Sequence, residues 1–168
     1  VDANVMGVIA ALLSPVAKLH AMTPRDDLPV HDPMAKIAPR LRTGAERQLP
    51  PLLADARETV GRGPVPSCVI HGDLHAGQLL VDDRGVAWLL DLDDMALGDP
   101  AADLGNFAAH LATREAALAR PGLEGMRHIL SLTLRAYAHA GGKADAAQAD
   151  AYGRLALLRR AVKLRERG

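Results

Sequence analysis

The sequence predicts an α+β domain that is mostly helical, arranged as a helical bundle with a β-hairpin inserted in its middle. Three observations lead to this prediction. Aromatic residues make up only 2 % of the 168 residues, so Leu, Val, Ile and Ala must fill most of the core. Apolar residues recur at helical spacing towards both ends of the chain. Between these regions, short apolar runs alternate with turn-forming residues, as expected for short strands.

The part of the chain that precedes the hairpin is expected to be helical with interruptions. Residues 7–22 carry Ile, Leu and Val at helical spacing, and residues 33–42 and 45–60 have similar patterns. The polar, proline-containing stretch 25–32 is expected to be a loop between the first two helices. Residues 61–64, Gly-Arg-Gly-Pro, are expected to form the loop that ends this region.

Three short apolar runs in the middle of the sequence predict strands over residues 68–70, 79–81 and 86–90. The last two runs are separated by Asp-Asp-Arg-Gly, a sequence typical of a tight turn. Gly85 is expected to adopt the positive φ that such a turn requires. The sequence therefore predicts a β-hairpin whose first strand follows a polar loop, residues 71–78.

The last third of the chain is expected to form three helices. Asp99 is a suitable N-cap, and Pro100 is favoured at the first position of a helix. A second helix is predicted over residues 123–140, where Gly141 and the glycine after it end the pattern. The third is predicted over residues 146–167, with apolar residues along one side.

Composition limits the classes of function. The 20 Lys and Arg residues balance the 20 Asp and Glu residues, which gives no general attraction to nucleic acid. The apolar stretch 5–13 is too short to cross a bilayer, so no membrane partner is expected. The single cysteine, Cys68, has no internal disulfide partner, which favours a reducing, cytoplasmic location. The chain length suits one domain, residues 1–168.

The charges are unevenly distributed along the chain. Residues 71–103 contain eight aspartates and a single base, Arg84. Carboxylates gathered in this way predict a bound cation. Residues 154–168 contain six bases and one acid, Glu166. These bases either bind a phosphate or a partner or form a solvated face of the last helix, and we favour the solvated face.

Three motifs in the acidic region carry a family resemblance. They are His71-Gly-Asp-Leu-His75 followed by Gly-Gln78, Leu90-Asp-Leu-Asp93, and Gly98-Asp-Pro-Ala-Ala-Asp-Leu104. In this order and spacing they resemble the catalytic signature of the aminoglycoside phosphotransferase and choline kinase superfamily. Leu19-His20 resembles the helix that follows the hinge between the two lobes in that superfamily. The resemblance implies a protein-kinase-like C-terminal lobe whose hairpin carries the catalytic loop.

The resemblance also implies roles for individual residues. Asp73 is implied to be catalytic, accepting or orienting the proton of an acceptor hydroxyl. Asp91 is implied to hold Mg²⁺ that bridges the phosphates of ATP. Gln78 occupies the position where the family usually has asparagine, and its amide oxygen is a suitable Mg²⁺ ligand. Gln78 and Asp91 are therefore expected to bind both the metal and, through it, the nucleotide.

Four further residues are expected to support this site. His71 is expected to hold the metal-binding segment by a hydrogen bond. His75 is expected either to contact phosphate or substrate or to pack in the loop. Asp93 is expected either to contact a second metal or substrate or to be a solvated acid. For Asp103 the resemblance implies hydrogen bonds to the catalytic loop, whereas its place in the first turn of a helix equally suits an acid.

The nucleotide-covering lobe of a kinase is not found in these 168 residues. Such a lobe needs a glycine-rich loop and a lysine on a strand. Gly61-Arg-Gly63 is followed by proline, and Gly141-Gly-Lys143 is followed by alanine, so neither forms a phosphate-binding loop. The missing lobe is expected to be supplied in cis or in trans, and the isolated chain is expected to be inactive.

The acceptor is expected to be a small molecule such as a sugar, an amino alcohol or an aminoglycoside-like compound. Two other functions remain open from the sequence. The chain is alternatively a non-catalytic binding or regulatory relic of the kinase-like fold. A metal-dependent hydrolase is the third interpretation, because His71, Asp73 and His75 alternate along the chain, and an extended backbone directs alternate side chains the same way.

Overall fold

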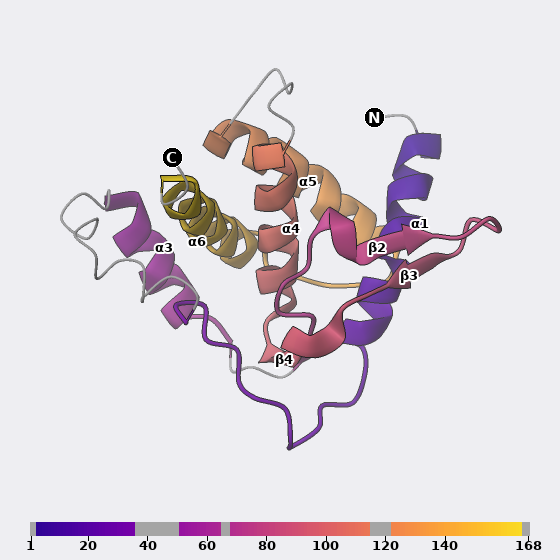
Figure 1. Ribbon diagram of the computed structural model, residues 1–168, viewed down its shortest axis with the longest axis horizontal. Helices are drawn as coiled ribbons and strands as arrows, with labels where there is room; N and C mark the ends of the chain where they lie inside the picture. Colours follow the sequence, from indigo (N-terminus) through magenta and orange to yellow (C-terminus); the bar gives the residue numbers. More distant parts are fainter. Residues whose placement is uncertain (1–2, 36–50, 65–67, 115–121, 166–168) are drawn as a thin grey trace.

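The structure, a computed structural model, describes residues 3–35, 51–64, 68–114 and 122–165 (Figure 1). The predicted α+β, mostly helical class is confirmed over these residues. The helices of the described residues are α1 (Ala3–His20), α3 (Pro51–Gly61), α4 (Pro100–Arg114), α5 (Gly122–His139) and α6 (Ala146–Arg165). No helix among these residues is long and apolar enough to cross a membrane.

Helix α4 lies at the centre of the helical part, with α5 and α6 packed against it (Figure 1). Helix α3 covers the outer side of α6, and α1 packs on α5. The principal core is formed where α1, α4 and α5 meet, around the fully buried side chains of Leu13, Leu104 and Met126. Burying such side chains contributes about 1.5–3 kcal/mol each.

Glycines allow α4 and α6 to approach each other closely. A Cβ on Gly105 of α4 would lie 2.6 Å from both the carbonyl oxygen of Ala149 and the amide nitrogen of Gly153 on α6. The backbones of the two helices therefore touch at this point. This contact fixes the distance between α4 and α6, and with it the reach of α6 side chains towards the polar loop.

The strands form two small antiparallel sheets. β1 (Cys68–Ile70) pairs with β4 (Ala96–Gly98), and β2 (Leu79–Val81) pairs with β3 (Ala87–Leu89) as a hairpin. Strand β4 is not predicted from the sequence, because three residues that contain a glycine give no alternating pattern. Gly98 is needed there because a Cβ would run into Cδ1 of Ile70 on the paired strand. Two 3₁₀ turns, η2 (Ala76–Gln78) and η3 (Leu92–Asp94), connect the strands.

The turn of the hairpin is organised by Asp82. Its carboxylate accepts hydrogen bonds from the backbone N–H groups of Arg84 and Val86 and from the indole of Trp88. The bond from Trp88 is the largest cause that lowers the pKa of Asp82. Gly85 has φ 77°, as the turn sequence predicts. The hairpin extends past α1 and away from α3 and α6 (Figure 1).

The segment that follows α1 differs from its prediction as a simple loop. Val30 forms a parallel bridge with Leu97 of β4, and His31 N–H donates to the Leu97 carbonyl at 2.8 Å. Backbone groups of β4 that β1 leaves unpaired are thus satisfied by this segment. Of the helix predicted over 33–42, residues 33–35 form a turn and the rest lies outside the described residues, as do residues 45–50.

Candidate active site

The polar loop 71–78 is anchored to α4 by a buried aspartate. Asp103 is 1 % exposed and accepts hydrogen bonds from the backbone N–H groups of His71 (2.7 Å) and Gly72 (3.0 Å). His20 Nε2 lies 3.0 Å from the same carboxylate, and its Nδ1 lies 2.7 Å from the hydroxyl of Tyr137. With the His20 proton on Nε2, His20 donates to Asp103 and accepts from the hydroxyl of Tyr137. The loop backbone is therefore fixed from α1, α4 and α5 together.

Gly72 lets the loop contact the turn that follows the hairpin. It has φ 79°, a conformation that favours glycine. A Cβ at this position would collide with the carbonyl oxygen of Asp94 in η3. The glycine of the motif thus brings two parts of the acidic region into backbone contact.

Asp73 projects from this anchored loop and is 28 % exposed at its side chain. Both terminal nitrogens of Arg159 on α6 donate to Asp73 Oδ1, at 3.3 and 3.2 Å. The amide of Asp73 lies 3.4 Å from His71 Nδ1. The carboxylate is therefore accessible and has a cation as its neighbour.

Arg159 is a residue that the sequence interpretation missed, because the bases of the last helix were interpreted as solvated. That interpretation is wrong for Arg154, which is 9 % exposed and pairs with Asp55 at 2.8 Å and with Asp150 at 3.0 Å. Arg159 lies four residues after the buried Leu155. This helical spacing was the signal that it faces inwards.

Gln78 and Asp91 meet although 13 residues separate them. Gln78 is 8 % exposed, and its Nε2 donates to Asp91 Oδ2 at 2.8 Å. Two oxygens that occupy adjacent positions on octahedral Mg²⁺ lie about 2.9 Å apart. Rotation of the Gln78 amide about its last bond exchanges Nε2 for Oε1 and places two oxygens at nearly this spacing. The donor pair therefore fits Mg²⁺, which uses one or two protein ligands and takes the rest from phosphates and water.

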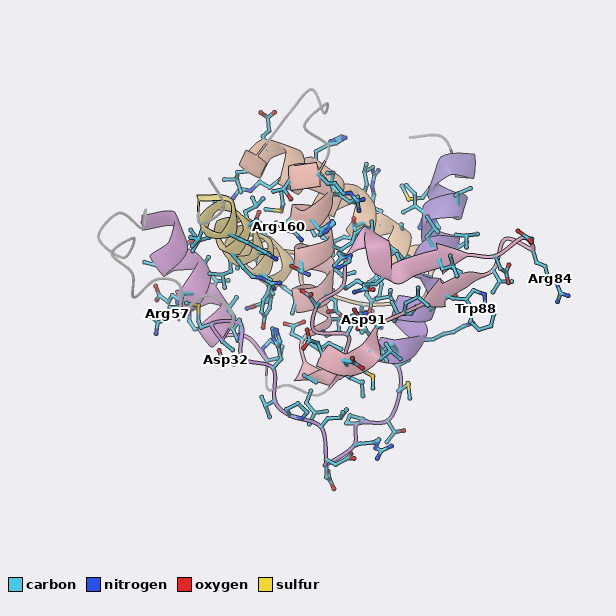
Figure 2. All side chains as sticks on the ribbon, viewed as in Figure 1. Asp32, Arg57, Arg84, Trp88, Asp91 and Arg160 are labelled. Carbon is cyan, nitrogen blue, oxygen red and sulfur yellow. The ribbon has the colours of Figure 1, made fainter. Side chains whose placement is uncertain are left out.

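The backbone at Asp91 is in the left-handed region, with φ 59°. For a residue other than glycine this conformation costs about 1–2 kcal/mol, and Asp is among the residues that tolerate it best. Such conformations are frequent at functional sites. Asp93 and Asp94, which follow in η3, are exposed. Figure 2 shows Asp91 between the base of the hairpin and the helices.

The two histidines of the motif have different surroundings. His71 is fully buried, and its Nε2 donates to the carbonyl of Leu90 at 2.9 Å, which ties the loop to the residue before Asp91. His75 accepts a hydrogen bond from Gly77 N–H at Nδ1 and stacks on His110 of α4, with ring centroids 4.5 Å apart. Burial is the largest cause that lowers the pKa of His75.

A cavity of about 270 Å³ opens beside the loop. Gly72 and Asp94 line one side, α4 contributes Asp103 and Asn106, and α6 contributes Arg159. Residues of the segment 29–35 and the α6 residues Tyr152, Leu155 and Ala156 complete the lining. Both apolar and charged groups therefore surround a space that Gly72 and Arg159, two neighbours of Asp73, help to line.

The side chains of His71, Asp73 and His75 do not converge as a metal-dependent hydrolase would require. His71 is directed to Leu90 and Asp73 to Arg159, whereas His75 faces Gly77 and His110. Within the described ranges no group of three His, Cys, Asp or Glu side chains has the geometry of a metal site. The hydrolase interpretation has no support from the described residues.

Comparison with known proteins gives a family match and similar solved structures. The profile of the Phosphotransferase enzyme family matches residues 7–161. Among solved structures, the chain is similar to the apoenzyme of macrolide 2'-phosphotransferase MphH from Brachybacterium faecium, with 26 % sequence identity and a TM-score of 0.52. That match covers 95 % of this chain and 53 % of the MphH chain, so the chain spans about half the length of this relative. Curated protein sequences give no match.

Proposed function

Because the chain belongs to the Phosphotransferase enzyme family, we propose that it is the catalytic lobe of a kinase that transfers a phosphoryl group from ATP to a hydroxyl of a small molecule. The observation that carries the proposal is the arrangement of one loop. Asp73 follows Gly72 and contacts Arg159, two residues that line a cavity, and Gln78 at the end of the same loop meets Asp91 from beyond the hairpin. A base for the acceptor and a metal-binding pair are the two parts that this chemistry needs.

Asp73 acts on the acceptor. It takes the proton of the attacking hydroxyl as the new O–P bond forms and the bond between the γ-phosphorus and the bridging oxygen of ATP breaks, releasing ADP. Its loop is held by the hydrogen bonds from His71 and Gly72 to Asp103, so the carboxylate does not need to be ordered when substrate binds. Positioning of this kind supplies most of the rate in phosphoryl transfer.

Gln78 and Asp91 would hold Mg²⁺ through an amide and a carboxylate oxygen. When bound, Mg²⁺ neutralises the charge that develops on the phosphate oxygens. His71 supports this pair through its bond to Leu90, which precedes Asp91. Asp103 is a positioning residue for the loop, and Asp93 is a solvated acid at the edge of the site.

The acceptor occupies the cavity between Gly72, α4 and α6. Its volume of about 270 Å³ suits a sugar or amino alcohol. The nucleotide-covering lobe lies outside the 168 residues and is provided in cis or in trans. The 53 % coverage of the MphH chain supports this division, since about half of that kinase-type chain has no counterpart in the match.

The test is a phosphotransfer assay of the full-length protein with ATP and Mg²⁺ across sugars, amino alcohols, aminoglycosides and macrolides. Asp73→Asn is expected to lower turnover by at least about a hundredfold, the usual scale for loss of a positioned proton acceptor. Nucleotide affinity should change little, because Asp73 faces the acceptor. Wild-type turnover in this variant would refute the assignment of Asp73.

Asp91→Ala separates the metal role from the proton role. It is expected to abolish the dependence of ATP binding on Mg²⁺, measured by titrating ATP with and without the metal. Gln78→Asn should retain that dependence, since it keeps an amide oxygen. Full-length protein that binds ATP and Mg²⁺ but transfers no phosphate to any acceptor in the panel would favour the non-catalytic alternative.

A further inference from the structure

Two consecutive arginines of α6 lie beside the loop that carries Asp73. Arg159 directs both terminal nitrogens to a single oxygen of Asp73, at 3.3 and 3.2 Å. Charge-assisted bonds between a nitrogen and a carboxylate are usually about 2.7–2.9 Å long. Arg159 also lines the cavity. Its guanidinium is therefore loosely held and accessible from the space next to the catalytic loop.

Arg160 is half-buried, and Figure 2 shows it on α6 near α4. Within the part of the chain that the structure describes, no carboxylate lies at ion-pair distance from it. A cation removed from water without a counter-ion is destabilising. Burial, followed by the neighbouring Arg159, lowers the pKa of Arg160.

His75 and His110 lie close enough to Arg160 for the three groups to interact electrostatically. Burial, then Arg160 and then His75 lower the pKa of His110 to about 4. Burial and Arg160 also lower the pKa of His75, against an opposing effect of Asp73. Asp73 is thus the acid that acts on both Arg159 and Arg160, whereas His110, with a pKa of about 4, carries no charge at neutral pH. Two arginines share one carboxylate, and a negatively charged ligand would balance the second positive charge.

We propose that Arg159 and Arg160 form a phosphate-binding subsite beside Asp73, which holds the phosphoryl group on the acceptor side of the reaction. This inference rests on the proposed function and deepens it. Guanidinium groups bind phosphate through paired N–H donors. When Asp73 takes the proton of the acceptor hydroxyl it becomes neutral and loosens its hold on Arg159. The arginine then becomes available to the phosphate ester that forms in the same step.

The direct test is the binding of inorganic phosphate to the full-length protein without nucleotide or metal, measured by calorimetry. Arg159→Gln and Arg160→Gln are each expected to weaken binding about tenfold or more, the scale of one lost charge-assisted hydrogen bond. Lys163→Gln is the matched control, because Lys163 is exposed on the same helix and the charge change is equal. Equal phosphate affinity in all three variants and wild type would overturn the proposal.

Two further variants distinguish the effect of the Arg159 charge on phosphate binding from effects on folding and on turnover. Arg159→Lys keeps the charge and is expected to bind phosphate better than Arg159→Gln; equal, weak binding by two folded proteins would contradict a phosphate contact. Asp73→Asn is expected to bind phosphate several-fold more tightly than wild type, although turnover is lost, because the competing carboxylate is removed. Weaker phosphate binding by Asp73→Asn would contradict the competition.

Nucleotide binding shows whether the subsite holds the γ-phosphate of ATP or the phosphate of the product. ATP and ADP binding to Arg159→Gln are compared in the presence of Mg²⁺. If the variant loses affinity for ATP but not for ADP, the subsite binds the γ-phosphate of ATP before transfer. Unchanged affinity for both nucleotides assigns it to the phosphate of the product. An equal loss for ADP and ATP would refute a position beside Asp73. Phosphate binding needs no turnover, so an inactive protein that binds phosphate would refute the proposed function and not the subsite.

Discussion

Gly72 combines two requirements at one residue: a left-handed backbone and the absence of a Cβ. Gly85 has the same backbone conformation, with φ 77° against 79°, but its missing Cβ would meet nothing within 4 Å. Comparing substitutions at these two positions therefore separates the cost of a left-handed backbone from the cost of a steric collision. Only at Gly72 does a side chain push apart the loop that carries Asp73 and the turn η3.

Gly72→Ala is expected to lower both stability and phosphotransfer, whereas Gly85→Ala is expected to cost only about 1–2 kcal/mol of stability, the left-handed penalty of an L-residue. The collision with the Asp94 carbonyl adds to that penalty and displaces Asp73. Urea unfolding and the phosphotransfer assay measure the two effects. Equal losses in the two variants would show that the contact at Gly72 does not position the loop.

His110 links pH to stability through its partly buried position on α4, where it stacks on His75 and lies near Arg160 of α6. Burial is the main cause that lowers its pKa from 6.5 to about 4, and Arg160, His75 and Arg114 act in the same direction. Between these two values the unfolded chain binds a proton at His110 that the folded chain does not. The contribution of His110 to the free energy of unfolding therefore decreases as the pH falls from about 6.5 to about 4.

His110→Gln is expected to lose less stability than wild type when the pH is lowered from about 7 to about 4. Urea midpoints at several pH values between these limits measure the difference. His128→Gln, at an exposed position on α5, is the control and should follow wild type. A wild-type pH dependence in His110→Gln would contradict the account.

At the scale of elements, the crossing of α4 and α6 decides what α6 offers to the site. Gly105 and Gly153 bring the two backbones together, and Arg159 lies less than two turns further along α6. A larger residue at the crossing forces the helices apart. Such a separation disturbs the packing of the core. It also moves Arg159, which lies on α6, relative to Asp73.

Gly105→Ala is expected to destabilise the fold by about 1–3 kcal/mol, the usual cost of overpacking. It should also weaken phosphate binding, because Arg159 moves with α6. Gly7→Ala is the control: Gly7 is exposed on α1 with nothing within 4 Å of an added Cβ, and alanine there should add up to about 1 kcal/mol of stability. Urea unfolding distinguishes the two, and a Gly105→Ala protein as stable as wild type would show that the helices separate without cost.

At the scale of the whole molecule, the acceptor side of the proposed site is nearly complete, and the nucleotide side is not. In the proposed function Asp73 is the base, Gln78 and Asp91 are the metal-binding pair, and the cavity receives the acceptor. The proposal assigns no described residue to the adenine. The outward-facing residues of the hairpin include Leu80 and Trp88, which are 53 % and 54 % exposed. An apolar surface of this kind is where a further lobe is expected to pack.

The isolated 168-residue chain is expected to fold and to show no measurable phosphotransfer. Correct positioning of reactants contributes about 7–11 kcal/mol in well-oriented systems, and most of it is lost when nothing holds the γ-phosphate in line with the acceptor. A coupled assay with ATP, Mg²⁺ and a panel of acceptors tests this, with Asp73→Asn of the same chain as the background. Clear turnover above that background would show that these residues suffice for catalysis.

Most helices and the hairpin were predictable because their signals are local. Pro100 after Asp99 starts α4, and the Asp99 carboxylate caps it by accepting the N–H of Ala101 at 2.9 Å. Gly141, with φ 91°, follows the end of α5. Strand β4 was missed because its pairing with β1 is non-local and its three residues carry no pattern of their own.

The sequence by itself determined the mostly helical class and nominated Asp73, Gln78 and Asp91, because a short motif fixes residue types and their order. Only the tertiary structure decided that Gln78 and Asp91 lie 2.8 Å apart and that Arg159, 86 residues after Asp73, reaches its carboxylate. The physical reason is that apolar spacing on α6 indicates which residues face inwards but does not indicate which distant side chain they meet. Packing of α6 against α4 decides that meeting: it brings Arg159 into contact with Asp73 and places Arg160 near the same carboxylate.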